Sequence, residues 1–210
     1  MITKIFSSNA RLILKNIQRR GMMGFSALGM FSKYVYDFHE GHAGMKYELG
    51  GKGSNLCEMT NLGIPVPPGF VISVGACKKY AQFEHLPKKI IAEYMTHLRT
   101  LEKTMGKKLG DDKDPLLVSV RSGAAISMPG MMDTVLNLGL NDKSVLGLAK
   151  KTKNMRFALD SYRRFIQMFG DVVMNIENKN FEEVLTRIKK KQKIKTDDKL
   201  TVNDLKYLIS

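Results

Sequence analysis

The chain has 210 residues, of which 43% are hydrophobic and 26% charged, and its formal net charge is +14. This length allows one domain or two small ones with a sizeable core. No apolar run approaches the roughly 18 residues of a membrane span, and the two cysteines lack the spacing of a zinc site or a disulfide framework. The composition therefore predicts a globular protein of a reducing compartment, with no membrane partner.

The positive charge is concentrated at the two ends of the chain. Residues 1–36 hold six Lys/Arg and no Asp/Glu, residues 151–210 hold 14 and 8, and the middle is nearly neutral. The densest basic run, residues 189–195, contains no aromatic side chains that would stack on bases. Because such runs are more often solvated helix ends, we expect no nucleic-acid partner.

Residues 1–32 have the composition of an organelle transit peptide. They are basic, amphipathic and serine-containing, and they lack any acid. We expect import into a mitochondrion or a mitochondrion-related organelle, with a plastid as the alternative, and cleavage between Gly21 and Lys33. A disordered basic tail on a cytoplasmic protein is the competing interpretation.

A short strand is predicted over residues 33–38, followed by a glycine-containing loop with His39 and His42. Two histidines three positions apart could begin a metal site. No further Cys/His cluster accompanies them, so we expect no metal site there.

The glycine-rich stretch GGKGSNL, residues 50–56, is the first candidate for an anion site. It is not a P-loop, because position 46 is Lys where a glycine is needed and Gly53 follows Lys52 in place of Ser or Thr. We expect a helix from about Ser54 to Asn61, with Leu56, Met59 and Leu62 as its buried stripe and Gly63 just past its end. A lysine and open N–H groups at a helix N-terminus suit a phosphate; a solvent-facing lysine on a tight turn is the alternative.

The rest of the chain alternates strands and helices up to residue 142 and then becomes purely helical. Further strands are predicted over residues 70–74, 116–120 and 134–138, and helices over 76–83, 87–105, 145–151, 154–174, 180–191 and 205–209. Asn180 with Glu183, and Thr201 with Asp204, have the spacing of N-terminal capping pairs.

The central stretch, residues 116–142, contains the second candidate. Arg121 ends an apolar strand that we expect to be buried, and a loop with Pro129–Gly130, Asp133 and Thr134 leads to the next strand. An arginine facing a loop with glycine and hydroxyl donors suits an anion such as phosphate. The alternative is a structural ion pair for Arg121, because a charge at the end of a buried strand needs a partner.

Three segments make the sequence recognisable: residues 49–73, 116–142 and 157–174 closely resemble the N-terminal part of the pyruvate, phosphate dikinase family. The resemblance implies an α/β (α+β) fold, the N-terminal part of an ATP-grasp-like nucleotide-binding domain over residues 33–142, with an all-helical subdomain over 143–210. The phosphohistidine domain and the pyruvate- and phosphoenolpyruvate-binding domain of the family have no counterpart in this chain.

The resemblance also implies the site residues. Lys52 and Arg121 match the lysine and arginine that contact the ATP phosphates, and the loop over the phosphates corresponds to Gly130, Met131, Met132, Asp133 and Thr134. Ser54 departs from the commoner alanine. Magnesium is expected with ATP, its protein ligands lying further along the family's chain, and no catalytic residue is expected in this one.

The implied reaction converts ATP, phosphate and pyruvate to AMP, diphosphate and phosphoenolpyruvate through a phosphohistidine, in an enzyme expected to be a homodimer. We expect this chain to be the ATP-binding portion of such an enzyme and inactive alone. A stand-alone truncated paralogue that binds a nucleotide or a partner without catalysis is the other hypothesis.

Overall fold

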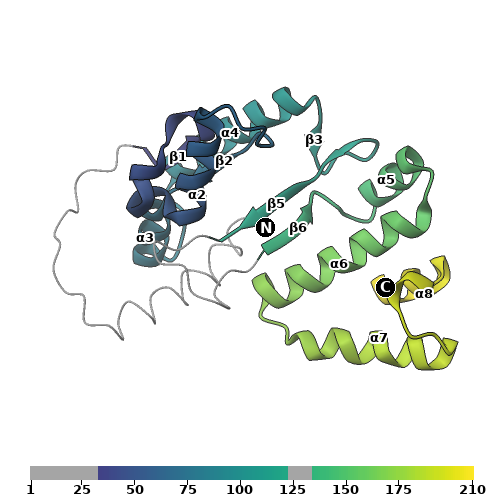
Figure 1. Ribbon diagram of the computed structural model, residues 1–210. Helices are drawn as coiled ribbons and strands as arrows, with labels where there is room; N and C mark the ends of the chain where they lie inside the picture. The colour runs from purple at the N-terminus through teal and green to yellow at the C-terminus, as the bar shows by residue number, and fades with distance from the viewer. Residues whose placement is uncertain (1–32, 123–133) are drawn as a thin grey trace. The chain divides into compact units, whose positions relative to one another are not determined.

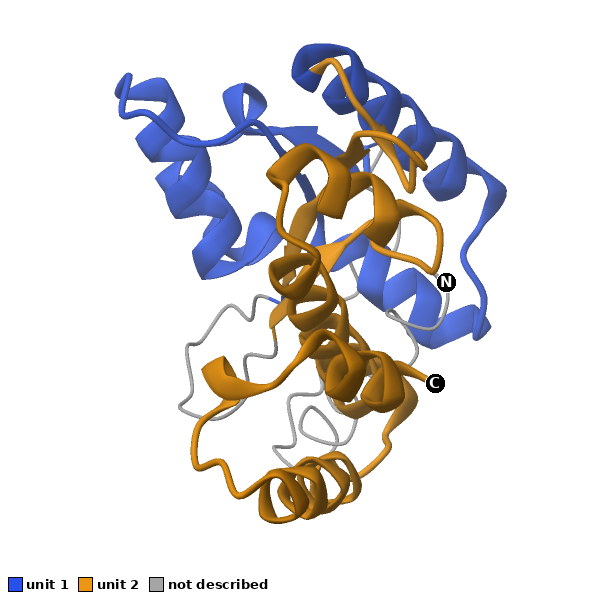
Figure 2. Cartoon of the chain, turned by 90° about the vertical axis from the view of Figure 1, so that its right-hand side faces the viewer, with its two compact units in different colours: residues 1–105, 122–133 blue, residues 106–121, 134–210 orange. Residues whose placement is uncertain are grey.

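The computed structural model describes residues 33–122 and 134–210, which form a mixed, helix-rich fold with three two-stranded sheets (Figure 1). The chain divides into two compact units, the first made of residues 1–105 and 122–133 and the second of residues 106–121 and 134–210 (Figure 2). Within the described ranges, no helix combines the length and the apolar character needed to cross a membrane.

The first unit packs three helices around a short antiparallel strand pair. Its elements are β1 (Val35–Asp37), η1 (Phe38–Glu40), η2 (Ala43–Met45), α2 (Lys46–Asn61), β2 (Phe70–Ile72), α3 (Val74–Phe83) and α4 (Lys88–Met105). β1 and β2 pair with Tyr36 opposite Val71. Glu93 of α4 fastens the start of β1, because its carboxylate accepts the backbone N–H groups of Tyr34 and Val35 at 2.6 and 3.1 Å.

The second unit places a hairpin and a small parallel strand pair beside four helices. Its elements are β3 (Lys108–Leu109), β4 (Pro115–Leu116), β5 (Val118–Arg121), β6 (Thr134–Leu138), α5 (Ser144–Thr152), α6 (Met155–Met174), α7 (Asn178–Gln192), η3 (Asp197–Lys199) and α8 (Val202–Ile209). β3 pairs with β4 in parallel, and β5 with β6 antiparallel. The helical core is aliphatic and includes Ala158, Leu159, Leu185, Leu200 and Leu205.

The boundary between the two units differs from the boundary expected at residue 142. The β5–β6 hairpin is grouped with the helices that follow it in the chain, because β6 packs against α6. The helical character after residue 143 is as expected, since α5, η3 and α6 to α8 are the elements found there.

The strand expected over residues 116–120 is divided and only partly buried. Leu116 is buried in β4, whereas β5 alternates half-buried and exposed positions and ends on an exposed Arg121. A register shift between Val118 and Val120 interrupts the pairing with β6. A strand in a two-stranded pair can lose solvent contact on one face only, which explains the alternation.

The helix ends test the predicted capping signals. Thr201 and Asp204 form the expected capping box of α8, with the Asp204 N–H donating to Thr201 Oγ1 and the Thr201 N–H to Asp204 Oδ2, at 3.2 and 2.9 Å. The prediction that Asn180 and Glu183 cap a helix is wrong, because α7 already begins at Asn178, directly after Glu177. Gly63 has φ +75°, the left-handed conformation expected after the end of α2.

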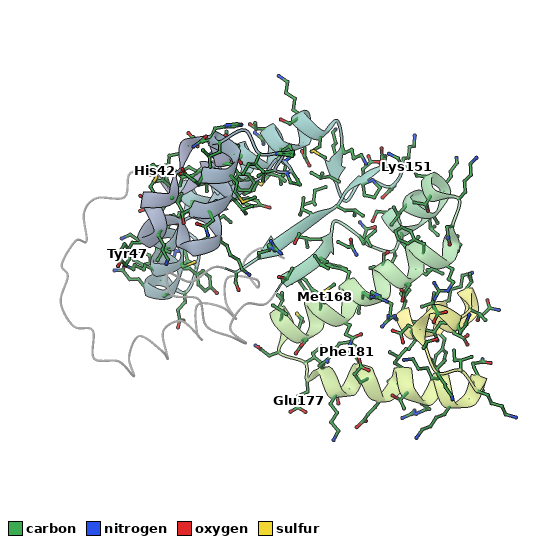
Figure 3. The ribbon with its side chains drawn as sticks, viewed as in Figure 1. His42, Tyr47, Lys151, Met168, Glu177 and Phe181 are labelled. Atoms are coloured by element: carbon green, nitrogen blue, oxygen red, sulfur yellow. The ribbon has the colours of Figure 1, made fainter. Side chains whose placement is uncertain are left out.

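Buried Arg163 links α6 to the segment before α8. Its guanidinium donates to Asp160 Oδ1 from Nε and Nη2 at 3.0 and 2.8 Å and to Asp197 Oδ2 at 3.1 Å. Nearer the C-terminal end of α6, a Cβ on Gly170 would lie only 2.5 Å from the ring of Phe181, which α7 directs toward α6 (Figure 3). A glycine there lets the two helices approach closely.

Candidate phosphate site

Lys52 lies on the first turn after a kink in α2. The helix runs from Lys46 to Asn61, but Gly50 has φ 72° and ψ 165°, a conformation that only glycine adopts readily. The residues after Gly50 therefore form a separate helical segment that begins at Gly51, three residues before the start expected at Ser54. Ser54 Oγ donates to the Gly51 carbonyl at 3.2 Å and braces this first turn.

The face that α2 buries is not the one that the sequence pattern predicted. The expected stripe fails because Leu62 is 68% exposed, Met59 is also exposed and Leu56 is only half-buried. The buried residues of α2 are spaced by three or four positions, and all but the first are small: Leu49, Gly50, Gly53, Ser54 and Cys57. Small side chains allow the helix to approach β2 closely, although they bury less apolar area than large side chains would.

The short helical segment before the kink is held by Tyr36 of β1. The Tyr36 hydroxyl donates to the Glu48 carboxylate, and burial together with this hydrogen bond raises the pKa of Tyr36 above its usual range. Leu49, the next residue, packs in the cluster of Tyr36 and Cys57. In contrast, Tyr47 on the same turn is 87% exposed (Figure 3). The turn that carries Lys52 therefore follows a segment that is fixed to β1 by a hydrogen bond and by packing.

Lys52 itself is half-buried. No residue within 33–122 or 134–210 forms an ion pair or a side-chain hydrogen bond with it. Its position supplies an uncommitted cation beside the N–H groups of a helical first turn, which have no acceptor one turn earlier in their own segment. A cation in such a position would attract an anion, and the phosphate contact of Lys52 stays a prediction.

Arg121 and Thr134 are register partners at the open end of the β5–β6 pair. Arg121 is exposed, and in the described part of the chain it forms no ion pair, so the alternative of a structural ion pair has no support there. The strand pairing therefore brings together Arg121 and Thr134, the two predicted site residues that flank the loop in the sequence. Gly130, Met131, Met132 and Asp133 lie outside the described residues.

Lys52 belongs to the first unit, and Arg121 and Thr134 belong to the second. The structure thus joins the last two in one hairpin and presents the lysine on a different unit. Each unit contains at least one cation that no described acid neutralises.

A polar cluster that sequence reasoning missed surrounds the end of β1. Asp37, Glu40 and His97 place one ligand atom each within 4.8 Å of one another, and His97 Nδ1 lies 2.8 Å from Asp37 Oδ1. Burial raises the pKa of Glu40, but hydrogen bonds from Lys33 and from the Asp37 backbone outweigh it, so the pKa is lower than usual. These internal partners occupy the carboxylates, and His97 is 60 positions from Asp37, so no local signal predicts the cluster.

Comparison with known proteins agrees with the resemblance of the central segments. The family described as pyruvate phosphate dikinase, AMP/ATP-binding domain, matches residues 46–98. The pyruvate, phosphate dikinase of Clostridium symbiosum is 53% identical over 178 residues, which are 84% of this chain and 20% of the relative. The chloroplastic enzyme of Mesembryanthemum crystallinum is 56% identical over 171 residues, 81% of this chain and 18% of the relative.

The similarity extends beyond plants and bacteria. The pyruvate, phosphate dikinase of Entamoeba histolytica is 49% identical over 175 residues, 83% of this chain and 20% of the relative. The chain therefore spans about a fifth of the length of the curated relatives it matches. Over most of its own length, this chain corresponds to the N-terminal part of the pyruvate, phosphate dikinases.

Proposed function

We propose that this chain binds the phosphates of ATP as the nucleotide-binding portion of a pyruvate, phosphate dikinase. The reaction would convert ATP, phosphate and pyruvate to AMP, diphosphate and phosphoenolpyruvate through a phosphohistidine carried elsewhere. The observation that carries the proposal is the half-buried Lys52, which has no partner among the described residues and lies on a first helical turn. Identity of about 50% to named dikinases supports the same conclusion.

The chemistry of phosphoryl transfer fits these residues. Such transfers need positioning and charge neutralisation more than covalent help from the protein. Lys52 would neutralise phosphate oxygens as a point charge, and Arg121 would bind them through its planar fork. Thr134 would donate its hydroxyl, and residues 130–133 would lie over the phosphates as the resemblance implies.

Magnesium is proposed to enter with the nucleotide. Mg²⁺ takes oxygen ligands and retains several waters, whereas Lys52 and Arg121 are cations and Thr134 offers one hydroxyl oxygen. The carboxylates of the first unit that lie close together, Asp37 and Glu40, are already paired with His97 and Lys33. The phosphate residues of this chain therefore fit the nucleotide, and they do not by themselves fit the metal.

The finer features of the assignment are proposals of the same kind. We infer an ATP-grasp-like arrangement and a homodimeric enzyme. Residues 1–32 are proposed to be an organelle transit peptide. The chloroplastic names of several relatives support a plastid, and they give no support to the mitochondrion expected from the sequence.

The test is calorimetric titration of the 210-residue chain with Mg-ATP. We expect a dissociation constant of about 1 mM or weaker, equivalent to only ~4 kcal/mol, because the chain would supply a few phosphate contacts and few metal ligands. Lys52→Ala should remove most of the heat. Lys46→Ala is the matched control, because Lys46 is an exposed lysine on the same helix, before the kink.

The second unit has its own control pair. Arg121→Ala should weaken binding, whereas Arg187→Ala, a change at an exposed arginine of α7, should leave it unchanged. The chain alone should form no phosphoenolpyruvate in a coupled assay. Micromolar binding of Mg-ATP would instead favour a stand-alone nucleotide-binding module, and equal effects of Lys52→Ala and Lys46→Ala would refute the site.

A further inference from the structure

Gly53, the residue after Lys52, lies where α2 approaches β2 closely. A Cβ built on Gly53 would lie 2.8 and 3.2 Å from the two γ-carbons of Val71 and 3.4 Å from the Cβ of Leu49. Carbon atoms in ordinary contact are about 3.5–4.0 Å apart. Any side chain at this position would therefore require the Val71 side chain or the α2 turn to move.

Val71 is held in place by its strand. It pairs with Tyr36 in register, and it packs against the cluster of Tyr36, Leu49 and Cys57. The strand pair is in turn fixed by Glu93, which accepts the N–H groups at the start of β1. A methyl group on Gly53 would thus be accommodated mainly by a shift of the α2 turn, of about 0.7–1.2 Å if ordinary carbon contacts are restored.

That shift would fall on the residue that carries the proposed phosphate contact. Lys52 directly precedes Gly53, and the same turn is defined by the kink at Gly50 and by the hydrogen bond from Ser54 to Gly51. The packing of this turn sets where the Lys52 ammonium and the neighbouring N–H groups point. A change between Gly53 and Val71 would therefore alter the anion site without removing any group that contacts an anion.

We propose that Gly53 and Val71 are positioning residues for the phosphate contact of Lys52, set by the close approach of α2 to β2. The inference rests on the proposed function, in which Lys52 binds nucleotide phosphate. Glycine is needed at position 53 for the short distance between α2 and β2, apart from the conformational freedom that a glycine has. Alanine is otherwise the better helix former, so a purely local requirement for glycine would not arise at this position.

The experiment is an amide NMR titration of the 210-residue chain with Mg-ATP, alongside urea unfolding of the same samples. Far below saturation, the initial slope of the shift at residues 51–53 is proportional to affinity. Gly53→Ala should lower this slope about tenfold, as expected when part of a charge-assisted contact is lost. Val71→Ile, which adds bulk from the strand side, should lower it in the same direction and is the milder variant if Gly53→Ala does not fold.

A second substitution that removes the clash separates an effect on the position of Lys52 from an effect on the stability of the fold. In the double variant Gly53→Ala/Val71→Ala the clash is removed, so the slope should recover to within about twofold of the original, while the lost side-chain volume keeps the stability below that of the unmodified chain. Gly63→Ala is the control, because Gly63 has positive φ, so alanine would strain the backbone, while a Cβ there meets nothing within 4 Å. It should lower the stability and leave the slope unchanged.

The outcomes distinguish the two hypotheses. If Lys52→Ala does not change the slope, the proposed function fails and this inference fails with it. If Lys52→Ala lowers the slope but folded Gly53→Ala and Val71→Ile do not, only the positioning role is overturned. A loss in Gly53→Ala that tracks stability, with no recovery in the double variant, would likewise overturn it.

Discussion

Replacing Arg163 by methionine should destabilise the second unit far more than the same change at its neighbour Arg164. Both arginines lie on α6 and both bind Asp160, Arg163 at 2.8 and 3.0 Å and Arg164 at 3.1 Å. The Arg163 side chain is 8% exposed, and the Arg164 side chain is 57% exposed. The pair therefore compares a buried and an exposed ion pair on one carboxylate.

The magnitude follows from what each change leaves behind. Breaking a buried pair usually costs about 3–5 kcal/mol, because one charge stays buried and unpaired. Here Asp197 would keep Lys189 and Asp160 would keep Arg164, so we expect a smaller loss, about 2–3 kcal/mol. Arg164→Met should cost at most about 0.5–1 kcal/mol, as an exposed pair does.

The assay is urea unfolding followed by circular dichroism, with amide hydrogen exchange in α6 and α8 to assign the loss to the second unit. At about 1 M salt, where the Debye length is about 3 Å, the small Arg164 effect should vanish and most of the Arg163 effect should remain. Equal costs for the two variants would refute the reasoning, and so would a loss of protection confined to the first unit.

Three further results are expected. In a full-length dikinase that contains this chain, Lys52→Ala and Arg121→Ala should each slow the ATP half-reaction on the order of 10²-fold, and normal phosphorylation of the enzyme histidine by both variants would contradict the site. Burial raises the pKa of Asp197, but the hydrogen bond that it accepts from a lysine outweighs burial, so its pKa is lower than usual. The stability that Asp197 contributes should therefore be complete above about pH 4, the pKa of the unfolded state, and should decline as the pH falls toward the folded pKa. Asp197→Asn should accordingly flatten the acid limb of the curve of unfolding free energy against pH. Mass spectrometry of the native protein should find an N-terminus between Gly21 and Lys33, and a dominant unprocessed form would rule out the transit peptide.

Some failures of the sequence predictions have one physical origin. Apolar periodicity assigned Leu56, Met59 and Leu62 to the core, yet α2 buries Leu49, Gly53 and Cys57. A similar contrast is seen in α6, where the large side chain of Phe157 is exposed while its small neighbour Ala158 is fully buried. Hydropathy rewards large apolar side chains, whereas close approach between elements requires small ones, and the identity of the approaching element is not visible in a local window.

Other predictions succeeded because the interactions behind them are local. The capping box of Thr201 and Asp204 spans three residues, and the left-handed Gly63 follows from the helix end beside it. Backbone geometry of this kind depends on neighbouring side chains and little else. The same applies to the glycine-rich turn that carries Lys52, although the kink at Gly50 moved its start.

By itself, the sequence determined the family resemblance, the residues expected to meet phosphate and most of the element order. Only the tertiary structure decided that Arg121 and Thr134 are register partners, that His97 joins Asp37, and that Gly53 rests against Val71. Each of these contacts joins residues well separated along the chain. Their formation depends on how strands pair and how helices pack, and the free energy of that packing is a property of the assembled unit and not of any one segment.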